Sequence, residues 1–418
     1  MYLSIRNNFI NCKNKISKLI ILMPSIKLYF MFLSYLLGSI LFLFVVIRKD
    51  LSVDHPLRFW DMVATVIKWP NCFHAWGIDT FSTNTNTILL QGVCWGFNYG
   101  VFTMPLYGLL AWISPNAFFW VFAFSILSFF LLMYIAPKTP ISHLFALVIL
   151  ISPPVTLLFE SGNPDVINIF LCLIAGIGLA KKKETIFVFC ASIISLHKFY
   201  GIIMFVILLF GTIRKKRLIL SIFNLSAVLT VFMIISYQVF FIGINSYIDA
   251  ASNHYGISIW DNYLSKKSIM VDQQIIQLFG LTTLILGTYI LVRTNKKHFK
   301  EEEKLNLSKL TSIGFYLIFL FSYTVVNNVD YRLTFLCVAL ILDVKHVLNK
   351  VNLFRLYLVL ILSSLYFTYP WGYKELIPGL PIQVLGDLAL HFVAMFCLTR
   401  VLYLLQQFKY DLNLESIN

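Results

Sequence analysis

The sequence predicts an all-α protein that crosses a membrane many times, and two observations lead to that fold class. Hydrophobic residues make up 59% of the 418 residues, charged residues make up only 12%, and the mean hydropathy is +0.81. A soluble domain has roughly 25% charged residues. Apolar runs of about 20 residues also recur along the whole chain, and a helix of that length crosses the hydrocarbon core of a bilayer. We expect a polytopic transmembrane domain with about 10–13 spans.

The formal net charge of +14 does not indicate a nucleic-acid partner, because the basic residues form neither a stripe nor a tail. They occur in short clusters between apolar runs, as in cytoplasmic loops that follow the positive-inside rule. The clusters therefore set the expected orientation of the spans. They lie at residues 13–18, 181–183, 214–217, 296–297 and 345–350.

The first expected element is a span at residues 26–47, with the N-terminus in the cytoplasm. This run is too long for the apolar region of a signal peptide and lacks a small-residue cleavage site, so we interpret it as an anchor. Residues 48–97 form an outer loop rich in tryptophan, which favours amphipathic helices lying in the membrane interface. Cys72 and Cys94 in this loop could form a disulfide or remain two thiols. No cysteine and histidine spacing indicates a zinc site.

A helical bundle is expected over residues 98–405, and a cytoplasmic tail over residues 406–418. Three full crossings between residues 98 and 159 would leave the polar cluster at residue 160 on the wrong side. One of these segments, near the prolines of residues 137–154, is therefore expected to be re-entrant or interfacial. The expected segments are 98–113, 116–136, 141–159, 163–180, two short helices within 185–212, then 218–242, 275–293, 310–326, 333–343, 352–369 and 382–405.

Short polar clusters interrupt the apolar chain, and this topology places all of them at the outer face. A bilayer tolerates ionisable groups only where they face a protein interior or a water-filled cavity. Their convergence predicts an active site at the outer membrane surface rather than a pore. The clusters are Asp54–Asp61, Glu160–Asp165, His197-Lys198, His254–Asp261 and Asn327–Arg332.

Two carboxylates of the first outer loop are candidate general bases. Asp54 and Asp61 come shortly after the first span. A carboxylate at the membrane surface can accept a proton from an attacking hydroxyl within hydrogen-bond reach. Either aspartate could instead cap a helix.

Cationic side chains at the outer face are candidate phosphate ligands. Lys198 lies between two apolar helices, where an ammonium group needs an anion or must snorkel to the interface. An ammonium point charge suits a phosphate, and the planar fork of Arg332 suits it as well. Arg332 could alternatively form a surface pair with Asp330. We expect His197 to be a hydrogen-bonded helper rather than a metal ligand.

The remaining clusters allow both a functional and a structural interpretation. Asn163 and the proline after it are typical of a helix start and need no further role. Glu160 could hold a sugar hydroxyl or pair with Lys198. His254 lies in a loop of aromatic and polar residues, which suits sugar rings but also any interfacial loop.

Short motifs spread over most of the chain resemble one enzyme family. After the aspartates of the first outer loop come Phe97-Asn98-Tyr99-Gly100, Ser152-Pro153-Pro154 leading to Gly162-Asn163, Lys198-Phe199-Tyr200 and Asp330-Tyr331-Arg332. With these motifs the chain resembles the GT-C superfamily of polyprenol-phosphate-sugar-dependent glycosyltransferases, especially the alpha-mannosyltransferase-like group of glycosyltransferase family 87. Departures from the pattern are Gly100 and Gly201 in place of prolines, Asn163 where that group often has glutamine, and one extra residue after Asp54, which leaves the choice between Asp54 and Asp61 open.

The resemblance implies a GT-C-like fold and transfer of a hexose, such as mannose, from a polyprenyl-phosphate donor to a glycan or glycolipid acceptor, with inversion. Asp54 or Asp61 would be the base, and no cofactor is implied, although a divalent ion is possible. The active site would face outward from a bacterial inner membrane. Donor phosphate would contact Lys198, Arg332 and His197, and substrate would contact Glu160, Asn163, Asp165, Asn98, Tyr99, His254, Asp330 and Tyr331.

Two alternatives to this function remain open. An O-antigen-type polysaccharide polymerase uses the same substrate class, but it is expected to have arginine-rich later loops, and the second outer loop here contains no arginine. A lipid or small-solute transporter is expected to show polar residues at mid-bilayer depth, paired broken helices and internal symmetry.

Overall fold

In the computed structural model, helices make up most of the part of the chain that is described. That part comprises residues 109–110, 112–114, 117–211, 254–255, 273–299, 305–325, 328–329, 333–348, 352–367, 375–377 and 380–415. The first half of its helices are α7 (Ala117–Ile135), α8 (Pro140–Leu150), α9 (Pro153–Ser161), α10 (Asp165–Ala180), α11 (Glu184–His197), the 3-10 helix η4 (Phe199–Phe205) and α12 (Val206–Gly211). The second half are α15 (Gln273–Phe299), α16 (Leu307–Val325), α17 (Leu333–Leu342), α18 (Val344–Val347), α19 (Asn352–Phe367) and α20 (Ile382–Glu415).

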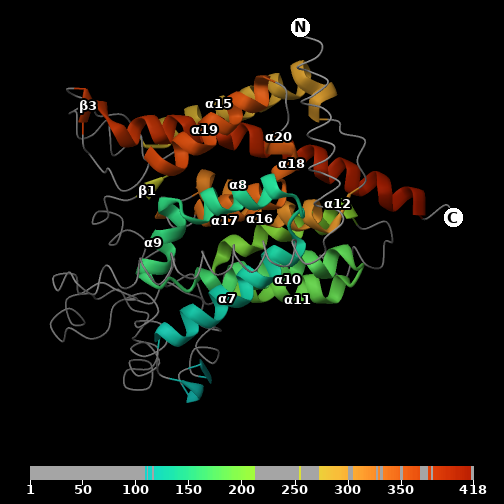
Figure 1. The fold of residues 1–418 in the computed structure, drawn as a ribbon. Coiled ribbons are helices and arrows are strands. Elements are labelled where there is room, and N and C mark those ends of the chain that lie inside the picture. Colours follow the sequence, from blue (N-terminus) through green and yellow to red (C-terminus); the bar gives the residue numbers. More distant parts are fainter. Residues whose placement is uncertain are drawn as a thin grey trace, which may run out of the picture.

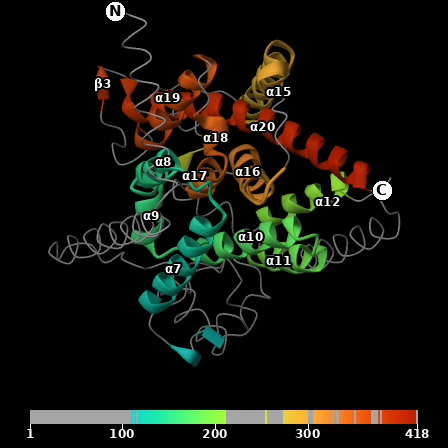
Figure 2. The same cartoon turned by 45° about the vertical axis from the view of Figure 1, so that its right-hand side comes forward.

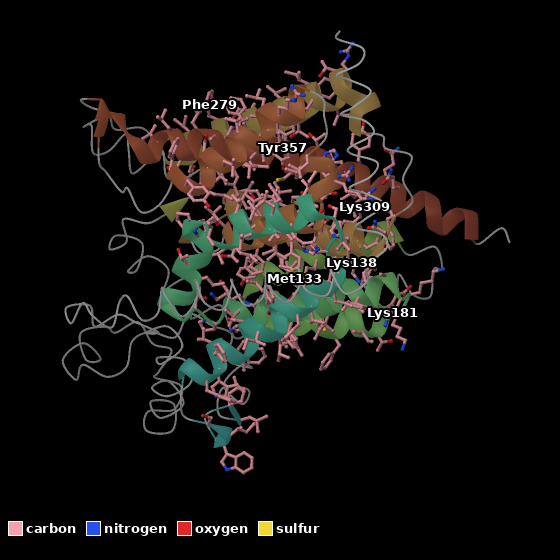
Figure 3. The ribbon with its side chains drawn as sticks, viewed as in Figure 1. Met133, Lys138, Lys181, Phe279, Lys309 and Tyr357 are labelled. Atoms are coloured by element: carbon pink, nitrogen blue, oxygen red, sulfur yellow. The ribbon has the colours of Figure 1, made fainter. Side chains whose placement is uncertain are left out.

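Three of the described helices are long and apolar enough to cross a membrane, by length and composition. They are α15, α16 and α20. The side chains of α15 are largely uncovered, since Leu278 is 67% exposed and Phe279 is 69% exposed. Figure 3 shows Phe279 at the outer surface of the bundle. Apolar side chains in such a position fit a lipid environment, so this part of the chain is that of a helical membrane protein.

The helices pack in layers. In both views, α7, α10 and α11 lie on one side, α16 and α17 lie in the middle, and α15, α19 and α20 lie on the other side (Figures 1 and 2). Every residue of α17 is buried. A helix that is apolar on all sides belongs in the interior of a bundle, as α17 does here.

Most predicted segments that fall within the described residues correspond to a helix, although some boundaries differ. The expected first span at 26–47, the outer loop at 48–97 with Cys72 and Cys94, and the segment 218–242 lie outside the described residues. The expected segment 141–159 is divided at Ile151-Ser152 into α8 and α9, which meet at an angle (Figure 1). Pro153 causes this division, because a proline is tolerated at a helix start but not inside a helix. The expected boundary at residue 405 lies inside α20, which continues to Glu415. Polar residues can extend a helix beyond the apolar run that defines its span.

Short strands were not predicted for this all-α fold. β1 (His254–Tyr255) pairs antiparallel with β2 (Asn328–Val329), and β3 (Glu375–Ile377) pairs with β4 (Leu380–Pro381). The first pairing places His254 opposite Val329. It therefore joins two of the polar clusters that the sequence placed at the outer face.

Three residues with non-helical backbone conformations bound and connect the helices of the α10–α11 hairpin. Gly162 has a φ of 59° shortly before α10, and Lys182 has a φ of 57° between the two helices. The amide of Lys183 closes that connection by donating to the carbonyl of Gly178 at 2.8 Å. Lys198 is extended, with φ −143° and ψ 127°, and divides α11 from η4. The break expected within residues 185–212 is thus observed at Lys198, where α11 ends and the chain continues as η4 and α12 in place of one second helix.

Three described lysines lie at one end of the bundle. Lys138, Lys181 and Lys309 all lie toward the right in Figure 3, whereas β1 lies at the left in Figure 1. Since Lys181 follows α10 and Lys198 follows α11, the two lysines lie at opposite ends of this hairpin. By the positive-inside rule, the end with Lys138, Lys181 and Lys309 is the one expected to face the cytoplasm.

Gly201 leaves no room for a side chain, which accounts for its presence where the resemblance led us to expect proline. A Cβ atom there would lie 2.6 Å from the backbone nitrogen of Ser195 and 2.7 Å from the carbonyl carbon of Ile194. We expect Gly201→Ala to lower the free energy of unfolding by about 1–3 kcal/mol, the usual range for overpacking. Thermal unfolding of the purified protein measures this change. Equal stability of the variant and the parent would show that η4 and α11 can separate without loss.

Candidate functional site

An ion pair joins the two polar clusters at one end of the hairpin. The Nζ atom of Lys198 lies 3.0 Å from Oδ1 of Asp165. It also donates to Oδ1 of Asn163 at 3.5 Å. The sequence left Glu160 open as a partner for Lys198. The side chain of Glu160 lies outside the described part of the structure, and Asp165 is a partner that the structure does show.

Three further side chains extend this pair into a network. Asn168 Nδ2 donates to Asp165 Oδ1 at 2.8 Å and to the hydroxyl of Tyr200 at 2.7 Å. The Tyr200 hydroxyl in turn donates to Asp165 Oδ1. Oδ1 of Asn168 lies 2.6 Å from Nδ1 of His197. We call these six side chains the hairpin cluster: Asn163, Asp165, Asn168, His197, Lys198 and Tyr200.

The hairpin cluster is held away from solvent. Asp165 is 0% exposed, and Lys198 is 8% exposed. A buried charge is tolerated only when an opposite charge and hydrogen bonds compensate for lost hydration. Asp165 has such compensation twice, because it also stands in the first turn of α10, where the helix dipole favours an anion.

Local backbone geometry positions the charged pair. The amide nitrogen of Asp165 donates to Oδ1 of Asn163 at 3.0 Å, which fixes the turn before α10. The extended conformation of Lys198 ends α11 and directs the chain into η4. Tyr200, the second residue of η4, packs edge-on against Phe335 with ring centroids 5.6 Å apart. The cluster is therefore anchored to α17 as well.

The paired strands β1 and β2 lie near the N-terminal end of α17, which is also the end that contacts the hairpin cluster. β2 ends at Val329 and α17 begins at Leu333, so the two residues are at most about 14 Å apart. Phe335, which contacts Tyr200, is in the first turn of α17. Parts of the clusters at residues 160–165, 197–198, 254–261 and 327–332 are thus brought to one end of the described bundle.

Several predicted site residues cannot be placed by this geometry. Glu160 lies in α9 with only its backbone described, and for His254 only the backbone pairing is described. Seven other residues lie outside the described part of the chain: Asp54, Asp61, Asn98, Tyr99, Asp330, Tyr331 and Arg332.

Asn168 and Tyr200 belong to the cluster but were not among the predicted site residues. Tyr200 belongs to the Lys198-Phe199-Tyr200 motif, and this motif is the sequence signal that could have predicted it as a site residue. Asn168 is three residues after Asp165 in an apolar helix, a spacing that puts both side chains on one helix face.

A second buried ion pair lies away from the hairpin cluster. Arg400 on α20 donates from Nε to Oδ2 of Asp343 at 2.7 Å and from Nη2 to Oδ1 at 2.9 Å. Asp343 separates α17 from α18, and both charged residues are buried. The pair of Asp343 and Arg400 therefore connects α20 to the central layer. Lys309 is also buried, and Figure 3 shows it at the same end of the bundle as Lys138 and Lys181.

Among the described residues, no group of three or more histidine, cysteine, aspartate or glutamate side chains could hold a metal ion. The sequence matches no protein-family model, no curated protein and no solved structure. The hairpin cluster and the sequence motifs are therefore the features that indicate a function.

Proposed function

We propose that the protein is an integral-membrane glycosyltransferase that moves a sugar from a polyprenyl-phosphate donor to a glycan or lipid-linked acceptor. The observation that carries the proposal is the position of Lys198. Its ammonium group is held by Asp165 and Asn163 at the end of the hairpin opposite Lys181. A cation at that place suits the phosphate of a lipid whose tail lies in the bilayer.

The chemistry then divides between two parts of the chain. Lys198 stabilises the negative charge that develops on the departing phosphate. An aspartate of the first outer loop, Asp54 or Asp61, accepts the proton of the acceptor hydroxyl as that oxygen attacks the anomeric carbon. Positioning donor and acceptor in line supplies a large part of the acceleration. The GT-C resemblance supports this division.

The direct test supplies the full-length protein in lipid nanodiscs with polyprenyl-phosphate sugars and measures lipid-linked glycans by mass spectrometry. Transfer that depends on the polyprenyl-phosphate donor is expected, and nucleotide sugars alone are expected to give none. If all donors of this class remain unconsumed with every acceptor extract from cells that express the chain, the proposal fails.

Substitution of each aspartate of the first outer loop identifies the general base. We expect one of Asp54→Asn and Asp61→Asn to lower transfer by at least about 10²-fold, because general-base catalysis contributes about 10²–10⁴-fold. Protein yield and thermal stability should stay unchanged. Full activity in both variants would remove these two residues from the proposed mechanism.

Transport is the second candidate, and the buried pairs Asp165–Lys198 and Asp343–Arg400 favour it. Paired ionisable groups inside a membrane protein also occur along ion and proton pathways. In sealed vesicles that contain the protein, a transporter moves a labelled polyprenyl-phosphate sugar across the bilayer without changing it. A glycosyltransferase consumes the same lipid's sugar, so the products distinguish the two functions.

A further inference from the structure

We infer that Tyr200 and Asn168 are positioning residues that allow Lys198 to exchange Asp165 for the phosphate of an anionic lipid. This inference depends on the proposed function, because it concerns how the same site receives its donor. The sequence motifs gave no role to Asn168, and the proposal above assigns none to Tyr200.

One carboxylate oxygen of Asp165 has neutral hydrogen-bond donors in addition to Lys198. Oδ1 of Asp165 accepts hydrogen bonds from Asn168 Nδ2 and from the Tyr200 hydroxyl, in addition to its contact with Lys198. When the ammonium group turns away, the carboxylate keeps two neutral donors. A buried carboxylate that retains hydrogen bonds stays ionised at much lower cost than one left bare.

The two charged partners differ in burial and in backbone setting. Asp165 is fully buried on a helix, whereas Lys198 retains 8% exposure. The backbone of Lys198 is extended between α11 and η4, so its side chain projects from a helix break. The flexible stem of lysine can redirect its ammonium group by rotation about four bonds. Lys198 is therefore the partner that moves.

The two positioning residues, Tyr200 and Asn168, are themselves held by neighbouring side chains. The ring of Tyr200 is 2% exposed and packs against Phe335 of α17. Asn168 is bound on its other side by His197, with 2.6 Å between Asn168 Oδ1 and His197 Nδ1. Both groups are fixed before any ligand arrives, so they hold Asp165 in place while Lys198 changes its partner. Such preorganisation lowers the cost of binding an anion.

The test measures binding of a polyprenyl monophosphate to the full-length protein in nanodiscs, with inorganic phosphate as a parallel probe. Tyr200→Phe removes one donor, so Asp165 should hold Lys198 more tightly and the affinity should fall about tenfold. Asp165→Asn removes the competing anion, so the affinity should rise about tenfold. A purely structural role of the cluster would lower the affinity in both variants.

The double variant adds a check that does not depend on the size of either effect. Once Asp165 carries no charge, the hydroxyl of Tyr200 has no carboxylate to hold. Asp165→Asn with Tyr200→Phe should therefore bind like Asp165→Asn alone. If Asp165→Asn does not fold, Tyr200→Phe decides alone, since unchanged affinity in a stable Tyr200→Phe protein refutes the exchange.

The two probes distinguish the source of the anion, and the transfer assay distinguishes this inference from the proposed function. A response to the lipid alone assigns the site to a lipid head group, and an equal response to inorganic phosphate assigns it to free phosphate. Partner exchange without any sugar transfer would refute the glycosyltransferase proposal only. Sugar transfer with equal affinity in all variants would refute the exchange only.

Discussion

Replacing Arg400 with glutamine is expected to lower the free energy of unfolding by about 3–5 kcal/mol, which is the usual cost of removing one partner of a buried ion pair. The guanidinium group contacts both carboxylate oxygens of Asp343, at 2.7 and 2.9 Å. Without it, the carboxylate of Asp343 remains buried with an uncompensated charge. Thermal unfolding in detergent and in nanodiscs measures the loss.

A hydrophobic replacement of both partners provides the decisive control. Asp343→Leu with Arg400→Met removes both charges at similar volume, and such exchanges are often neutral or stabilising. Arg355→Gln, on an exposed position of α19, is the matched single substitution and should leave stability unchanged. If Arg400→Gln were as stable as the parent, the contact between α20 and the α17–α18 junction would not hold the bundle together.

The positions of the helices could be predicted because polar clusters bound the apolar runs. The expected segment 116–136 corresponds to α7 (Ala117–Ile135), and the segment 333–343 corresponds to α17 (Leu333–Leu342). Hydropathy fails where a helix does not end with its apolar run. α20 continues through polar residues to Glu415. Strands β1 and β2 have two residues each, which is too short for the alternation of apolar and polar residues that predicts a strand.

The sequence predicted where the polar clusters lie, but it did not predict which side chains contact each other. Charge-based topology placed Asp165 and Lys198 at one end of a hairpin, and the structure brings them to 3.0 Å. The contact between Asp165 and Lys198 depends on how α10 is rotated against α11, which a single sequence does not show. The pairing of Asp343 with Arg400 was not predicted, because the two residues are 57 positions apart and only the packing of the helices brings them together.

Replacing Lys198 with glutamine should reduce transfer from a polyprenyl-phosphate donor by about 10²-fold or more, the effect seen when one preorganised donor to a developing negative charge is removed. Glutamine keeps a hydrogen-bond donor near Asp165 but carries no charge. The donor concentration needed for half-maximal rate should rise as well, because the ammonium group also attracts the phosphate of the donor before the reaction. Initial rates across a range of donor concentrations measure both effects.

The control for Lys198→Gln must separate lost charge at the site from lost charge in general. Lys181→Gln serves this purpose, since Lys181 is exposed at the opposite end of the same hairpin (Figure 3). We expect that variant to retain full transfer. Thermal unfolding identifies any loss caused by leaving Asp165 without its cation. A stable Lys198→Gln protein with parental rates and parental donor requirement would show that the buried ammonium group only neutralises Asp165, and the phosphate-binding role would then have to lie elsewhere.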